Sequence, residues 1–176
     1  MPDGGVGGSH RPPFTLAPEE LAVEETGSVK TELGFHLSLT FPAEVRQWEE
    51  LIVEAAQESG LDPNLYAALI KNESWTFDRE LCPDGPVTPS CTSRSGALGI
   101  AQVMPFHFSE DEEGRDPRTN IFRGAEILSE YLARKNGDVR MGLAAYNCGP
   151  NRSTYDSGCW AYADQILEWY REVIAP

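Results

Sequence analysis

Apolar residues recur at helical spacing over most of this chain, and this pattern constrains its fold more than any other feature. In the stretch from Ala43 to Ser59, for example, Val45, Ile52 and Ala56 fall on one face. The predicted helices are 43–59, 62–75, 116–132, 139–146 and 160–174. Residues Leu33 to Phe41 instead alternate between apolar and polar or small residues, which predicts a half-buried strand. We therefore expect an α+β fold, mainly α.

Capping residues mark the boundary between the first two predicted helices. Gly60 is a natural stop, Asp62 is a good N-cap and Pro63 suits the first position of a helix.

The chain has 176 residues, which is enough for one domain with a hydrophobic core. One domain is therefore expected.

The first 32 residues lack a sustained apolar pattern, and Gly, Pro, Glu and Ser dominate them. Residues 1–32 are therefore predicted to be a flexible tail or linker, and residues 33–176 the folded domain. The stretch from Met1 to His10 has neither a basic n-region nor an apolar h-region, so no signal peptide is visible. No stretch of the sequence is long and apolar enough to cross a membrane.

The charge balance excludes some classes of partner. The formal net charge is −14, and nucleic-acid binding depends on clustered Lys and Arg. We therefore expect no nucleic-acid partner. The three histidines, His10, His36 and His107, form no ligand cluster, so no metal site is predicted.

The four cysteines lie in loop-like stretches and include no C-x-x-C pair, so they match neither a zinc site nor a thioredoxin-like motif. Four cysteines allow three pairings, of which Cys82–Cys91 and Cys148–Cys159 is the most economical. Disulfides would imply an oxidising compartment, which favours an extracytoplasmic protein that is periplasmic, cell-wall-associated or secreted. The alternative is a cytosolic protein with four free thiols.

Glu73 is the first candidate for chemistry. It lies one helical turn beyond Leu69, at the end of an apolar stripe on the second predicted helix. Burial there would raise the pKa of the carboxyl group and make it a proton donor near neutral pH. The same position also suits an ordinary exposed Glu at a helix end.

Two further clusters carry polar groups. Gln102 follows closely spaced glycines and offers a donor and an acceptor to a sugar, while Tyr146 and Asn147 lie together at a helix end. Taken alone, each cluster is also what a structural turn or a helix cap would contain.

The order of these motifs is more specific than any one of them. Glu73-Ser74 is followed by Ser93-x-x-Gly96-Ala97-x-Gly99-x-x-Gln102-x-Met104-Pro105, then Asn120-Ile121-x-x-Gly124 with Tyr131-Leu132, then Ala144-Ala145-Tyr146-Asn147-x-Gly149-Pro150. From about Phe41 to its C-terminus, the chain resembles the catalytic domain of soluble lytic transglycosylases, relatives of goose-type lysozyme.

The resemblance implies a lysozyme-like fold with a sugar-binding cleft and Glu73 as the catalytic acid and base. It implies cleavage of the β-1,4 bond between N-acetylmuramic acid and N-acetylglucosamine of peptidoglycan, leaving a 1,6-anhydromuramoyl end. No metal or other cofactor is implied, and the protein is expected to be a monomer. The positions that match cleft residues of the family are Ser93, Gln102, Met104, Tyr146, Asn147 and Tyr162.

The chain departs from the family in two places. The stretch from Glu73 to Ser93 is longer than usual, and it contains Asp78, Glu80 and Asp84. If one of these activated a water, the enzyme would be a hydrolytic, goose-type-like muramidase with a second carboxylate. A non-catalytic peptidoglycan-binding domain is a further alternative. The second departure is Cys148, where the family usually has Ala, and it is consistent with a link to Cys159.

Overall fold

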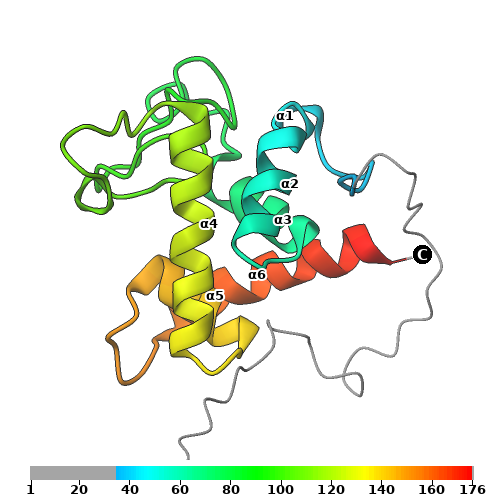
Figure 1. Cartoon of the computed structure of the whole chain (residues 1–176), viewed down its shortest axis with the longest axis vertical. Helices are drawn as coiled ribbons and strands as arrows, with labels where there is room; N and C mark the ends of the chain where they lie inside the picture. Colours follow the sequence, from blue (N-terminus) through cyan, green and yellow to red (C-terminus); the bar gives the residue numbers. More distant parts are fainter. Residues whose placement is uncertain (1–34, 176) are drawn as a thin grey trace, which may run out of the picture.

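The computed structural model describes residues 35–175, and Figure 1 shows how they are arranged. The predicted tail or linker, residues 1–32, lies outside this range, as do Leu33 and Gly34. The helices are α1 (Ala43–Arg46), α2 (Glu49–Glu58), α3 (Pro63–Ser74), the short 3-10 helix η1 (Pro105–His107), α4 (Pro117–Arg134), α5 (Val139–Cys148) and α6 (Ser157–Ile174). The described part of the chain is therefore mainly helical, as the sequence predicts.

Aspartate side chains begin the four long C-terminal helices, from α3 to α6. The Asp62 carboxylate accepts hydrogen bonds from the amides of Asn64 and Leu65, at 2.8 and 3.0 Å. Asp116, Asp138 and Asp156 do the same at the starts of α4, α5 and α6. Each carboxylate satisfies amides that have no partner inside the helix. The cap at Asp156 makes α6 begin at Ser157, three residues before the predicted start at Trp160.

The predicted strand over residues 33–41 is wrong for the described residues, 35–41. The alternation does describe burial, because Leu37 and Phe41 are 3% and 2% exposed whereas Leu39 is 83% exposed. The backbone, however, bonds to side chains instead of a neighbouring strand. The amide of Leu37 donates to Glu49 Oε1 at 3.2 Å, and that of Ser38 donates to Asn64 Oδ1 at 3.0 Å. Within residues 35–175, β pairing is limited to isolated antiparallel bridges, Thr92–Leu98 and Leu98–Val103.

The predicted helix 43–59 is divided into α1 and α2 at Gln47 and Trp48. The indole N–H of Trp48 donates to the carbonyl of Val87 at 2.8 Å. This bond attaches the loop between α3 and η1 to the helical core. The indole N–H of this half-buried side chain therefore has a hydrogen-bond partner.

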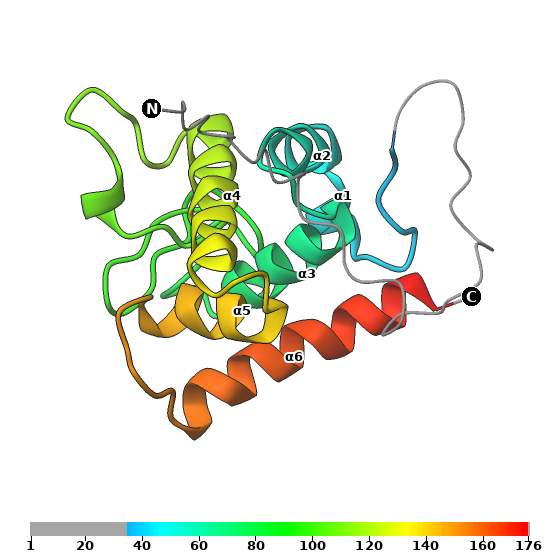
Figure 2. The same cartoon turned by 60° about the horizontal axis from the view of Figure 1, so that its bottom comes forward.

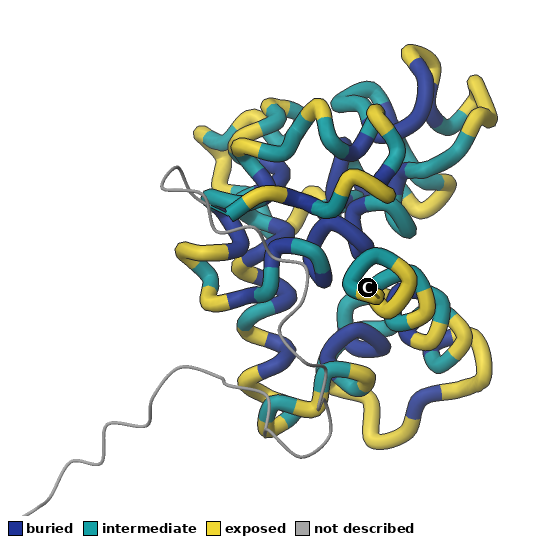
Figure 3. The backbone as a smooth tube through the Cα atoms, turned by 90° about the vertical axis from the view of Figure 1, so that its right-hand side faces the viewer, coloured by how far each residue is buried: buried dark blue, intermediate teal, exposed yellow. Residues whose placement is uncertain are grey.

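The helices pack so that α6 runs across α3 and α5, while α4 contacts α2 and α5 (Figure 2). Buried segments gather where the helices meet, and exposed segments lie at the outer turns (Figure 3). The long loop after α3 lies at the upper left of Figure 1, beside the start of α4. No helix in the described range is both long and apolar enough to span a membrane.

Candidate active site

Glu73 lies in the last turn of α3, where it is half-buried. The hydroxyl of Tyr162, on α6, donates a hydrogen bond to Glu73 Oε1. Burial raises the pKa of the Glu73 carboxyl group from 4.5 to about 7, although the hydrogen bond from Tyr162 opposes this rise. Glu73 is therefore a carboxyl group that can hold and release a proton near neutral pH.

Three tyrosines from three helices surround this carboxyl group. They are Tyr66 on α3, Tyr146 on α5 and Tyr162 on α6. Burial raises the pKa of each phenol well above 10, and the negative charge of Glu73 adds to the rise. All three therefore remain neutral hydrogen-bonding groups at neutral pH.

The structure thus brings together three residues that the sequence analysis selected or discussed, Glu73, Tyr146 and Tyr162. Tyr66 was not selected as a site residue. Its signal was present, because it lies seven residues before Glu73 and so on nearly the same face of α3. Its hydroxyl donates to the carbonyl of Ile121 on α4.

The segment from Leu98 to Gln102 lies beside the end of α3, and side chains from α3 and α5 hold it in place. The hydroxyl of Ser74 donates to the carbonyl of Ile100 at 2.6 Å. The hydroxyl of Tyr146 donates to the carbonyl of Ala101 at 2.8 Å. The positions of this segment and of Glu73 are therefore linked.

Asn120 is a third anchor of this segment. It was not among the site residues predicted from the sequence. Its Oδ1 accepts from the amide of Ala101 at 2.7 Å, and its Nδ2 donates to the carbonyls of Leu98 and Gly114, both at 2.8 Å. A Cβ at Gly99 would lie 2.7 Å from the Asn120 amide group, which explains why glycine occupies that position. The completely buried Asn120 side chain therefore satisfies a turn that has no regular secondary structure.

Gln102 has a positive φ of 49°, in the left-handed region that few side chains adopt. Its Nε2 donates to the carbonyl of Gly99 at 2.7 Å. Since this bond uses the amide nitrogen, Oε1 is the atom left to accept a hydrogen bond from a ligand. Gln102 is half-buried, as is Met104 two residues later.

Within the described part of the chain, two other predicted site residues, Ser93 and Asn147, make no hydrogen bond to the group around Glu73. The hydroxyl of Ser93 accepts from the amide of Ala97 at 2.9 Å, so it stabilises its own turn. Asn147 is exposed at the end of α5. Among the described residues, no hydrogen bond joins either of them to Glu73, Tyr146 or Tyr162, and their roles in binding stay predictions.

The cysteines form the two disulfides Cys82–Cys91 and Cys148–Cys159. The first closes part of the loop after α3, and Arg115 holds the same loop through the carbonyl of Pro89 at 3.0 Å and the hydroxyl of Thr92 at 2.7 Å. Asp78, Glu80 and Asp84 are all exposed on this loop.

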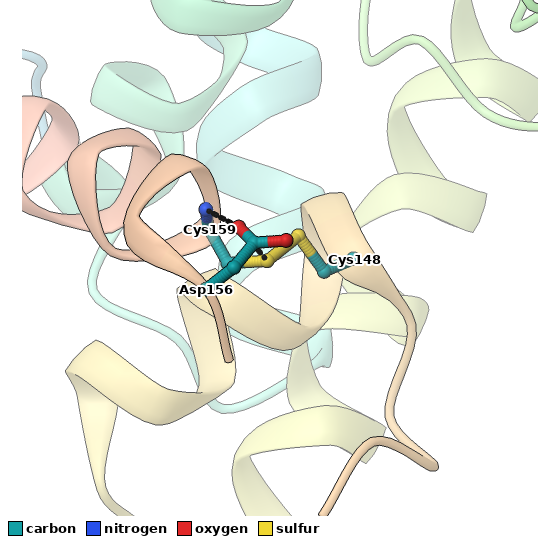
Figure 4. A group of neighbouring side chains, drawn as sticks. All are labelled: Cys148, Asp156 and Cys159. Carbon is teal, nitrogen blue, oxygen red and sulfur yellow. Dashed lines mark hydrogen bonds between the residues drawn. A yellow bond between two sulfur atoms is a disulfide. The ribbon is translucent and has the colours of Figure 1, made fainter. Parts of the chain in front are cut away.

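The second disulfide lies beside Asp156 at the start of α6 (Figure 4). Cys148, Asp156 and Cys159 are near enough to one another to be considered as metal ligands. The two sulfur atoms are bonded to each other, however, so neither is a free thiolate. This cluster is therefore a covalent link between helices.

Comparison with known proteins points to one family. Residues 50–158 match the family described as "Transglycosylase SLT domain". A transglycosylase of Enterobacteria phage PRD1 is 32% identical over 124 residues, which cover 69% of this chain and 42% of that protein. The chain thus spans less than half the length of this relative.

Two solved structures are similar in fold. The lytic transglycosylase Slt of Pseudomonas aeruginosa has a TM-score of 0.55 at 21% identity, covering 70% of this chain and 24% of that one. The 70 kDa soluble lytic transglycosylase of Escherichia coli has a TM-score of 0.56 at 21% identity, covering 72% of this chain and 24% of that one. The expected lysozyme-like fold is therefore confirmed.

Proposed function

The chain belongs to the transglycosylase SLT domain family, and on this premise we propose that it is a peptidoglycan lytic transglycosylase. It cleaves the β-1,4 bond between N-acetylmuramic acid and N-acetylglucosamine and leaves a 1,6-anhydromuramoyl end. Residues 33–176 form the catalytic unit. Glu73 is its single catalytic acid and base.

The observation that carries this proposal is the environment of Glu73. Burial raises the pKa of this carboxyl group to about 7, against the opposing effect of the Tyr162 hydrogen bond. Asp78, Glu80 and Asp84 are exposed. This arrangement favours a mechanism with one carboxyl group over a hydrolytic muramidase with two.

The proposed reaction uses Glu73 twice. The protonated carboxyl group first donates its proton to the glycosidic oxygen as that bond breaks. The substrate's own acetamido carbonyl stabilises the positive charge that develops on the muramoyl ring. The Glu73 carboxylate then takes the proton of the C6 hydroxyl group while the C6 oxygen attacks the anomeric carbon. Since this nucleophile belongs to the same sugar, it gains from proximity.

Neighbouring residues support substrate binding in this proposal. Gln102 Oε1 accepts a hydrogen bond from a sugar hydroxyl or from the N–H of an acetamido group. In this proposal the remaining residues that bind the glycan strand are Ser93, Met104, Tyr146, Asn147 and Tyr162. The substrate is a peptidoglycan glycan strand, and the enzyme acts as a monomer.

The two disulfides support an oxidising location, because such bonds persist outside the reducing cytosol. We place the enzyme in the periplasm, in the cell wall or outside the cell. This location also contains the proposed substrate.

Mass spectrometry of muropeptides tests the proposed function. The protein is incubated with purified peptidoglycan, and Glu73→Gln serves as the matched inactive control. Products lighter by one water, with 1,6-anhydro ends, are expected. Ordinary reducing ends would instead identify a hydrolase and direct attention to Asp78, Glu80 and Asp84. Binding to the polymer without any release would indicate a non-catalytic binding domain.

A further inference from the structure

The Cys148–Cys159 disulfide joins α5 and α6, the helices that carry Tyr146 and Tyr162. Cys148 is the last residue of α5, two residues after Tyr146. Cys159 is in the first turn of α6, three residues before Tyr162. Residues three apart lie on neighbouring parts of one helix surface. The covalent link is therefore one helical turn from Tyr162.

Helices α5 and α6 also pack directly against each other, and the segment that connects them adds contacts at this end. The connection over residues 149–156 has an exposed stretch at 151–154. Arg152 Nε donates to the carbonyl of Cys148 at 2.8 Å, and Lys135 Nζ donates to that of Pro150 at 2.9 Å. Toward α6, Arg152 pairs with Asp156 at 3.7 Å, and the Tyr155 ring packs edge-on against Trp160. The Asp156 cap is local to α6, since it accepts from the amides of Gly158 and Cys159.

Arg140 provides the main polar link between the two helices. It pairs with Asp164 at 2.6 Å and lies 4.4 Å from the centre of the Trp160 ring. Arg140 bonds to both carboxylate oxygens of Asp164, at 2.6 and 2.7 Å, although the two side chains are 47% and 54% exposed. The Cys148–Cys159 disulfide adds a covalent constraint on how α6 sits against α5.

The two tyrosines bond to different parts of the site. Tyr146 bonds to the carbonyl of Ala101, and Tyr162 bonds to Glu73. Ser74, next to Glu73, and Tyr146 bond to the adjacent carbonyls of Ile100 and Ala101, so α5 is linked to the end of α3 that carries Glu73. A displacement of α6 relative to α5 would therefore move Tyr162 relative to Glu73, and a hydrogen bond tolerates little change in distance or angle. We propose that the Cys148–Cys159 disulfide positions the active site by keeping the Tyr162 hydroxyl on the Glu73 carboxyl group. Cys148 and Cys159 are thus positioning residues, an inference that rests on the proposed function.

The Cys148→Ala/Cys159→Ala variant tests this proposal through the pH dependence of kcat. Tyr66, Tyr146 and Tyr162 are the titratable groups around Glu73, and their raised pKa values keep all three neutral over the assay range. The alkaline limb of the profile therefore follows Glu73. Loss of the Tyr162 bond removes an effect that lowers the Glu73 pKa. The limb should move to higher pH, with kcat lowered about tenfold and KM little changed.

A double-mutant cycle with Tyr162→Phe separates positioning from general stability. If the disulfide acts through Tyr162, adding Tyr162→Phe to the disulfide-free variant should have almost no further effect. Additive effects, or an alkaline limb that stays at its wild-type pH, would overturn the proposal. If the double alanine variant does not fold, Cys148→Ala/Cys159→Val is used, since valine refills the buried position of Cys159.

Cys82→Ala/Cys91→Ala is the matched control, because it also removes one disulfide with a similar sequence separation, 9 residues compared with 11. Its alkaline limb should stay in place, and an equal shift there would contradict a specific role for Cys148–Cys159. The pKa of Glu73 is also measured by NMR of the 13C-labelled carboxyl group, which needs no activity. Absence of anhydro products from the wild type would refute the proposed function, whereas an unchanged Glu73 pKa would refute only the positioning role.

Discussion

The Tyr162 hydroxyl donates a hydrogen bond to the Glu73 carboxyl group, across 89 residues of sequence and between α6 and α3. The bond favours the ionised carboxylate, whereas burial favours the protonated acid, and burial has the larger effect. With a pKa of about 7, both forms of Glu73 are populated at neutral pH. A group that acts first as an acid and then as a base needs both forms to be accessible.

Glu73→Gln should lower the rate of glycan cleavage by about a thousandfold or more, because an amide cannot donate a proton as a carboxylic acid does. The Gln side chain has nearly the same shape, so the fold and glycan binding should remain. Release of anhydromuropeptides measures the first effect, and circular dichroism with a sacculus pull-down measures the second. Wild-type turnover in this variant would remove Glu73 from the mechanism.

The same variant should be more stable than the wild type at alkaline pH. Glu73 has a pKa of about 7 in the folded protein compared with its ordinary 4.5, so the folded state binds the proton more tightly. Stability is therefore lost as the pH rises from about 4.5 to about 7. At about 1.4 kcal/mol per pH unit, the loss amounts to at most about 3.5 kcal/mol. Gln cannot titrate and escapes this loss.

Urea unfolding of both proteins at several pH values checks this linkage. The advantage of Glu73→Gln should approach its maximum above about pH 7 and shrink toward zero below about pH 4.5. An advantage that did not change with pH would show that the carboxyl group does not titrate with a raised pKa.

Tyr162→Phe should raise the pKa of Glu73, because it removes the hydrogen bond that lowers it. The alkaline limb of the kcat profile should then move to higher pH, and kcat should fall about tenfold. Tyr170→Phe is the control, because it changes the same residue type on α6 eight residues after Tyr162. A profile identical to the wild type would mean that the bond does not tune Glu73.

The sequence predicts well those features that depend on neighbouring residues. Asp62 with Pro63 marks the start of α3 because the cap bonds only two and three residues ahead. Glu73 was selectable because its helix has a clear apolar face. The expected strand near Leu37 failed for the opposite reason: its amides bond to Glu49 and Asn64, which are 12 and 26 residues away.

The contacts that support the site also join residues far apart in the sequence. Asn120 acts on Ala101 and Leu98, 19 and 22 residues earlier, and its burial depends on how α4 packs. The motif that contains Asn120 is present in the sequence, but an Asn near the start of a helix is equally typical of a helix cap. Tyr162 was selected by resemblance alone, because nothing local to α6 indicates that its hydroxyl bonds to Glu73.

Gly124→Ala should lower both stability and activity. A Cβ at this position would lie 2.6 Å from the Tyr66 hydroxyl, 2.7 Å from the Ala101 Cβ and 3.0 Å from the Tyr146 hydroxyl. The new methyl group would therefore displace the tyrosines around Glu73, with a stability loss of about 1–3 kcal/mol. Gly158→Ala is the control, since its nearest contact would be the Asp156 carboxylate at 3.3 Å. Denaturation curves and kcat should both distinguish the two variants.

Gln102→Gly should reduce activity by about tenfold or more while leaving stability within about 1 kcal/mol of the wild type. Glycine relieves the strain of the positive φ of 49°, and this gain offsets the lost hydrogen bond to Gly99 and the greater freedom of the unfolded chain. The activity falls because Oε1, the atom free to accept from substrate, is removed. Asn136→Gly is the matched control: Asn136 has a φ of 56° and is exposed away from the tyrosines. Full activity in both variants would mean that the left-handed backbone at Gln102 only shapes the turn. Loss of activity in Gln102→Gly alone would mean that the Gln102 side-chain amide is needed at this position to bind substrate.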